Sequence, residues 1–272
     1  IDNTSTTPAE RLGEECDMVL PSAARGLRGI NVLIAILIPT ILTATITSAG
    51  LASECDSTST GYIALTDLGA GTYMGYEGGL YPGGTNAGPD AHLQGGLAAA
   101  AQIVPRDVSG GSDPANGSIV LLSIGMCNTS LEYGAFINLA SGFPGLNPRV
   151  EIVQGAQGGW SASRVADPAA DFWENIDSTL AASGLSNDQV QAVWFKEANA
   201  LPTETFPTHA DSLRDQFARI MQILTARYQN VRICYLSSRI YAGYASTMLN
   251  PEPYAYEGGF AVKWLIESQM GG

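Results

Sequence analysis

The stretch SIVLLSIGMCNT, residues 118–129, decides how we interpret the rest of the chain. It opens on a short apolar run, SIVLLS, that is typical of a buried strand. The run passes into Gly125, Met126, Cys127 and Asn128. A reactive side chain at such a strand-to-helix turn faces a cleft, where the following helix N-terminus offers backbone donors to an anion.

Three similar runs follow, each bounded by turn residues: VEIV (150–153), VQAVWF (190–195) and VRICYL (231–236). Residues 169–182, 209–228 and 256–270 are predicted to be helices. In the second helix, one apolar stripe at three- and four-residue spacing is assigned to the core: Leu213, Phe217, Ile220, Leu224 and Tyr228. Strands alternating with helices predict an α/β fold, a parallel sheet with helices on both faces. Sites in such sheets lie at the carboxyl ends of the strands.

The next two strand ends carry glycine-rich or polar sequences. The second run leads into GAQGGWS (155–161), where glycines let the backbone approach a substrate oxygen. The third leads into KEAN (196–199), which places polar side chains at the same edge. We therefore expect three consecutive strand ends to form one site.

These blocks resemble the SGNH (GDSL-type) hydrolases, and within them the carbohydrate acetylesterases of the sialate O-acetylesterase-like group. The first block of that group has the sequence GQSN, to which GMCN (125–128) is similar, with Cys127 in place of the nucleophilic serine. In GGWS (158–161), Gly159 matches the oxyanion glycine, and Asn199 or Glu197 matches the third block. The resemblance covers about residues 118–272 and implies a three-layer α/β/α, flavodoxin-like fold.

The resemblance implies a secreted ester hydrolase acting on acetylated carbohydrate or a similar small ester. Cys127 would attack, and its backbone N–H, Gly159 and Asn199 or Glu197 would hold the oxyanion. Further substrate contacts are expected from four residues: Trp160, Ser161, Arg239 and Asn86. Arg239 has the alternative of pairing with an acid, and Trp160 that of core packing. No cofactor or metal is implied.

Two departures from the family pattern keep a second function open. No late DxxH segment supplies a base, and only His92 and His209 are present. We expect His209 to be solvated or capping, and the domain to be incomplete, with its last strand and its base in missing sequence. Cys127 is a nucleophile or an inert residue, with Ser123 and Ser130 as weaker nucleophiles. The alternative function is a non-catalytic carbohydrate-binding or cell-surface protein on a degenerate SGNH fold.

The first 117 residues are predicted to lie outside this domain. An apolar run at 30–46 follows two arginines, which predicts a signal peptide over 18–52 behind 17 translated non-coding residues. A membrane anchor and a buried core element are the alternatives. Residues 53–117, rich in Gly and Pro, are expected to form a surface loop without regular helix or central strand. In the other interpretation of that region, four residues wall a sugar cleft: Tyr73, Tyr76, Tyr81 and Asn86.

Composition limits the partners. A formal charge of -13 and a pI near 4.4 leave no basic face for nucleic acid. We expect a secreted or extracytoplasmic protein that meets a membrane only through an uncleaved signal segment. The cysteines are Cys16, Cys55, Cys127 and Cys234, without a CxxC pair, so no zinc site is predicted. Three of them fall in the mature part, and Cys127 is expected to be the odd one.

Overall fold

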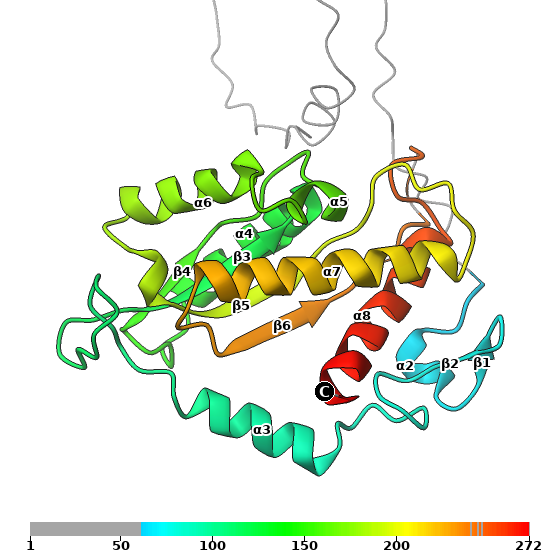
Figure 1. Cartoon of the computed structure of the whole chain (residues 1–272), viewed down its shortest axis with the longest axis horizontal. Helices are drawn as coiled ribbons and strands as arrows, with labels where there is room; N and C mark the ends of the chain where they lie inside the picture. The colour runs from blue at the N-terminus through cyan, green and yellow to red at the C-terminus, as the bar shows by residue number, and fades with distance from the viewer. Residues whose placement is uncertain (1–60, 240, 244, 246, 272) are drawn as a thin grey trace, which may run out of the picture.

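The computed structural model describes residues 61–271 apart from positions 240, 244 and 246 (Figure 1). The predicted signal peptide, the segment before it, Cys16 and Cys55 lie outside the described residues. None of the described helices combines the length and the apolar character needed to span a bilayer.

Four parallel strands form the central sheet in the order β4-β3-β5-β6. They are β3 (Ile119–Gly125), β4 (Val150–Val153), β5 (Val190–Lys196) and β6 (Ile233–Ser237). Each of the four predicted apolar runs therefore forms a strand. The chain leaves β3 for β4 on one side and returns to β5 on the other, so β3 and β5 flank the point where the winding direction changes. Ligands of open α/β sheets bind at this point.

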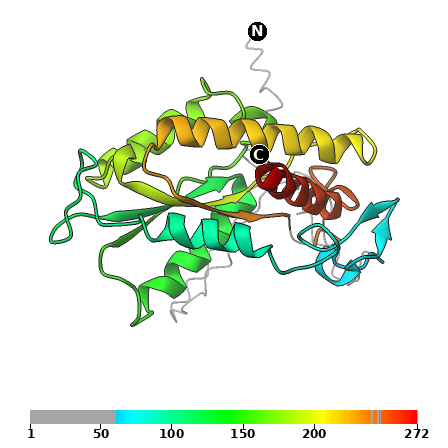
Figure 2. The ribbon, with the colours of Figure 1, turned by 60° about the horizontal axis from the view of Figure 1, so that its bottom comes forward.

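Helices cover both faces of the sheet, which gives a three-layer α/β/α arrangement (Figure 1). In Figure 2, α7 lies on one side of the sheet, and α3 and α4 lie on the other. The helices are α2 (Leu65–Leu68), α3 (Asp90–Ala100), α4 (Cys127–Ser141), α5 (Ala162–Val165), α6 (Asp171–Ala182), α7 (Thr208–Arg227) and α8 (Tyr254–Gly271). The three predicted helices correspond to α6, α7 and α8.

The main core lies between the sheet and α6 and α7. It contains the alternate β3 residues Val120, Leu122 and Ile124, because successive strand side chains point to opposite faces. The whole predicted stripe of α7 is buried in this core. On the opposite face, Tyr133 of α4 stacks on Trp194 at 5.3 Å and donates a hydrogen bond to the Leu121 carbonyl at 2.9 Å. Trp194 is thus a packing residue.

Helix α3 corrects the prediction that residues 53–117 hold no regular helix. The Gly/Pro punctuation ends at Pro89, which directly precedes the helix. The following sequence, DAHLQGGLAAA, is rich in strong helix formers despite two adjacent glycines. The Gly- and Pro-rich composition of residues 78–89 therefore does not continue into residues 90–100. No residue of α3 is buried, so this helix does lie at the surface.

The remaining N-terminal segment packs on α8 through aromatic rings. It includes a short hairpin of β1 (Thr72–Tyr73) and β2 (Tyr76–Glu77). The Tyr73 ring lies 5.1 Å from Phe206 and 5.8 Å from Phe260, and the Tyr76 ring lies 5.4 Å from Trp264. The Tyr73 hydroxyl also donates to Glu257 at 3.0 Å. Tyr73 and Tyr76 therefore anchor the hairpin.

Candidate functional site

A pocket opens at the carboxyl ends of β3, β4 and β5, beside the point between β3 and β5 where the winding direction changes. Its empty volume is about 330 Å³, including space open to solvent. Its lining consists of Met126, Cys127, Gly159, Trp160, Ser161, Asn199, Ala200, Leu249 and Asn250. Five predicted site residues are among them: Cys127, Gly159, Trp160, Ser161 and Asn199. The three strand ends therefore meet in one pocket, as expected from the parallel sheet.

The first wall is fixed by a close approach between the ends of β3 and β5. A Cβ atom on Gly125 would lie 2.3 Å from the Lys196 carbonyl oxygen and 2.5 Å from the Thr129 side chain. The Thr129 hydroxyl donates to that same carbonyl at 2.7 Å. Gly125 thus lets α4 begin directly against β5, which places Met126 and Cys127 at the pocket.

Replacing Gly125 by alanine is expected to lower the free energy of unfolding by about 1–3 kcal/mol, the usual cost of overpacking. A backbone oxygen is in the way, and it cannot rotate aside as a side chain would. Urea denaturation followed by circular dichroism measures the effect. Gly134→Ala, on α4, is the control, because a Cβ there has nothing within 4 Å. Equal stability of the two variants would contradict the packing argument.

The second wall comes from the loop after β4. Gly159 has a φ of +76°, in the left-handed region that favours glycine. The Arg164 guanidinium donates to the Gly159 carbonyl and lies 4.2 Å from the centre of the Trp160 ring. Trp160 therefore has one face covered by an arginine.

The third wall is the segment after β5, and hydrogen bonds from backbone N–H groups of the second wall hold it in place. The Ala162 N–H donates to the Ala198 carbonyl at 3.0 Å, and the Ser163 N–H donates to Asn199 Oδ1 at 3.2 Å. Because Oδ1 of Asn199 is engaged, its Nδ2 is the atom that an oxyanion or a carbonyl ligand would need. Asn199 thus lines the pocket with its oxygen already bonded, and its role as a donor stays a prediction.

Cys127 differs from its prediction. It is disulfide-bonded, and the free cysteine among the described residues is Cys234. The expectation that Cys127 is the odd cysteine is therefore wrong, because cysteine spacing alone does not reveal pairing. A disulfide-bonded sulfur has no thiolate with which to attack a carbonyl. Burial raises the pKa of the Cys234 thiol to about 12, which keeps it protonated.

Glu197, the alternative to Asn199, does not line the pocket. Its side chain is buried, and Oε2 accepts a hydrogen bond from the Ala198 N–H at 3.3 Å. Burial raises the pKa of this carboxyl well above its usual range. Of the two residues proposed for the third block, the structure brings Asn199 to the pocket and turns Glu197 inward.

Other predicted residues lie away from the pocket lining. Asn86 donates to the Thr66 carbonyl at 2.8 Å in the N-terminal segment. Burial lowers the pKa of Arg239, while the nearby carboxylates of Glu132 and Glu252 oppose that shift. Arg239 is thus near acids, as its alternative interpretation expected.

The two serines named as weaker nucleophiles have structural contacts. The Ser123 hydroxyl is buried and accepts hydrogen bonds from the N–H groups of Gly155 at 3.0 Å and Ala156 at 3.2 Å. Ser130 accepts from the Gln154 side-chain amide through its hydroxyl and its carbonyl. Both serines hold the end of β4 against β3 and α4, and neither lines the pocket.

His209 is buried, which corrects the expectation of a solvated or capping residue. Its exposed fraction is 2%, and its Nδ1 lies 3.6 Å from Oε2 of Glu257. The ring also packs edge-on against Tyr254 at 4.9 Å. Its place near a helix start did not reveal that α8 packs over it. His92 lies on α3 against Tyr81, and no described histidine lines the pocket.

Sequence reasoning missed Leu249 and Asn250, which close the pocket from the connection between β6 and α8. Asn250 is 4% exposed, and its Nδ2 donates to the Asn199 carbonyl at 3.0 Å. Its Oδ1 accepts no hydrogen bond within the described residues. The only signal was the turn-forming sequence NPEP (250–253) ahead of the last helix.

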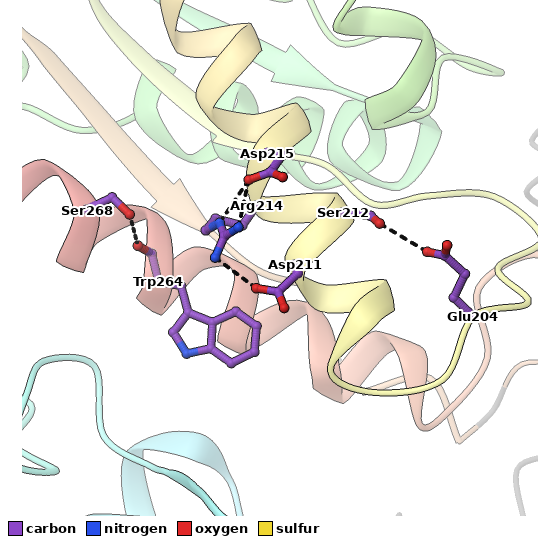
Figure 3. Close-up of polar contacts among 7 residues, drawn as sticks. All are labelled: Glu204, Asp211, Ser212, Arg214, Asp215, Trp264 and Ser268. Carbon is purple, nitrogen blue, oxygen red and sulfur yellow. Dashed lines mark hydrogen bonds and ion pairs between the residues drawn. The ribbon is translucent and has the colours of Figure 1, made fainter.

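A polar cluster on α7, drawn in Figure 3, has a structural role. Arg214 is paired with Asp211 and Asp215, each at 2.8 Å, and Ser212 donates to Glu204 at 3.1 Å. The single positive charge of Arg214 is shared between two aspartates at the surface, where ion pairs contribute little. Among the described residues, no group of three or more His, Cys, Asp and Glu side chains could hold a metal ion.

Comparison with known proteins adds no family to this geometry. No protein-family model matches the chain, and no curated protein matches it. The resemblance of the three blocks to SGNH hydrolases stays a prediction.

Proposed function

We propose that the chain binds a small acylated carbohydrate in the pocket at the strand ends, without hydrolysing it while Cys127 is disulfide-bonded. The observation that carries this proposal is the lining. It joins apolar surfaces of Met126, Trp160 and Leu249 to a few buried polar groups, and the cysteine in this lining, Cys127, is in a disulfide. Apolar walls with a small number of placed polar groups are typical of small-molecule sites.

The charge of the pocket and its few polar groups favour a small neutral ligand. Among the described residues, no acidic or basic side chain lines the pocket. The polar groups that do are the hydroxyl of Ser161 and the amides of Asn199 and Asn250, which suit hydroxyl and acyl oxygens.

Binding is tested by titrating the oxidised protein with acetylated and unacetylated methyl glycosides, followed by NMR chemical shifts and tryptophan fluorescence. We expect saturable binding of an acetylated glycoside. Ala200→Phe should abolish it, because the larger ring fills the pocket from a partly exposed position. Leu97→Phe, on the exposed surface of α3, is the matched control and should bind as before. Absence of saturable binding, or unchanged binding by Ala200→Phe, would refute the proposal.

A second function, ester hydrolysis by the reduced form, is favoured by one observation. The positions that resemble the nucleophile, the oxyanion glycine and the third block, namely Cys127, Gly159 and Asn199, all line the same pocket. A dithiol reductant would cleave the disulfide and leave a thiol at Cys127. Its thiolate would then attack the acyl carbonyl, expel the alcohol and form a thioester, which water would hydrolyse to the acid and the thiol.

Hydrolysis of p-nitrophenyl acetate, measured with and without dithiothreitol, tests this second function. A rate that appears on reduction and disappears in Cys127→Ala would support hydrolysis. Cys234→Ala is the control, since that buried thiol should contribute nothing. If the reduced protein hydrolyses the ester no faster than Cys127→Ala does, hydrolysis is refuted and only the binding function stays proposed.

A further inference from the structure

We propose that Cys127 is bonded to Cys55, and that this disulfide is a redox switch whose reduction places a reactive thiol in the pocket. The inference goes beyond the proposed binding function, which concerns the oxidised protein. It starts from the cysteines themselves. Cys127 is disulfide-bonded, and Cys234 is free. The chain has two other cysteines, Cys16 and Cys55, and both lie outside the described residues. One of these two is therefore the partner within the chain.

The chain that follows Cys55 is anchored near the pocket, which favours Cys55 over Cys16. The Tyr62 ring stacks on Tyr256 at 5.0 Å, in the first turn of α8, and the connection that leads into this helix lines the pocket. The seven residues from Tyr62 back to Cys55 span up to about 24 Å, which is enough to reach the pocket. Effective concentration falls roughly as the −3/2 power of tether length, so the 46-residue tether of Cys16 puts it at a disadvantage of about 17-fold.

The position of Cys127 makes the bond reducible. This residue is half-buried and lines the pocket, so a small dithiol can approach it from solvent. It is also the first residue of α4, whose first turn has no side-chain cap. The N–H groups of that turn stabilise a thiolate, which makes the Cys127 sulfur a good leaving group in thiol–disulfide exchange. Accessible disulfides with a stabilised thiolate are the ones that serve in regulation rather than as permanent cross-links.

The switch is a balanced two-electron exchange. The thiolate of a dithiol attacks the Cys55 sulfur, the S–S bond breaks, and its electron pair leaves with the Cys127 sulfur. The second thiol of the reagent then displaces Cys55 from the mixed disulfide, which gives the cyclic disulfide of the reagent and two protein thiols. In the opposite direction, oxidised glutathione takes up two electrons and two protons from the two thiols and becomes two molecules of glutathione.

Disulfide mapping of the full chain, folded in a glutathione redox buffer and blocked with iodoacetamide, tests the pairing. We expect the tryptic peptide that contains Cys55 to be linked to the one that contains Cys127. Cys16→Ser is the matched control and should keep this link. Cys55→Ser should lose it and leave Cys127 open to alkylation without a reductant. A link from Cys127 to Cys16, or between two copies of the chain, would overturn the pairing.

Alkylation of the native wild-type protein tests the switch without any variant. After treatment with dithiothreitol, we expect Cys55 and Cys127 to react with iodoacetamide together, at least tenfold faster than Cys234. Cys234 is the internal control, because burial raises the pKa of its thiol to about 12. If Cys55 and Cys127 react only after denaturation, the bond is a permanent cross-link and the switch is overturned. Neither experiment uses a ligand, so failure of the proposed function would leave both results readable.

Discussion

Replacing Glu132 by glutamine is expected to lower the free energy of unfolding by about 3 kcal/mol, because it leaves the buried ammonium group of Lys196 without a charged partner. Lys196 lies at the end of β5 with a side chain that is 0% exposed, and its Nζ is 2.6 Å from both carboxylate oxygens of Glu132. Burial lowers the pKa of Lys196, and the contact with Glu132 opposes this shift. Without the carboxylate, the charge has no equivalent partner.

A double-mutant cycle with Lys196→Met measures the coupling by urea denaturation. Lys196→Met alone should cost less than Glu132→Gln, since the Glu132 side chain is 30% exposed and can be hydrated. The double variant should recover most of the lost stability, because an apolar side chain then occupies the buried position. Glu151→Gln, at an exposed position of β4, is the control and should change little. Additive effects of the two substitutions would show that the pair is not coupled.

The regular elements were predictable because burial imposes a period on the sequence. Each sheet strand is a short apolar run between turn residues, and α7 shows its core stripe directly. Helix α3 was missed because it buries no residue, so its sequence has no apolar stripe facing a core. The parallel order of the strands then brought three separated blocks to one edge, which is why Gly159, Trp160 and Asn199 could be predicted as neighbours.

What the sequence did not predict depends on contacts between distant segments. Asn250 reaches the pocket only because the chain returns there between β6 and α8. The disulfide of Cys127 and the burial of His209 are likewise properties of packing, and no local pattern distinguishes them from a free thiol or a solvated ring. Asn199 and Glu197 fit the third block equally well in sequence, and only the direction of their side chains separated them.

Glu197 should make the protein less stable as the pH rises. Its raised pKa means that the folded state holds a proton that the unfolded chain releases at an ordinary glutamate pKa of about 4.3. Between these two pKa values the folded state binds more protons, so the free energy of unfolding falls by about 1.4 kcal/mol per pH unit from this group. Below the unfolded pKa both states are protonated, and the loss disappears.

Glu197→Gln keeps the neutral shape and removes the proton, so its stability should exceed that of the wild type at pH 8 and approach it near pH 4. Urea denaturation at pH 4, 6 and 8 measures the difference, in which the titration of all other groups cancels. For Glu174→Gln, at an exposed position of α6, the free energy of unfolding should change with pH in parallel with that of the wild type. Parallel curves for Glu197→Gln would mean that Glu197 is ionised in the folded protein. Lys196 and Glu197 thus respond differently to burial at one strand end: the lysine is held against a carboxylate, and burial of the glutamate favours its neutral form.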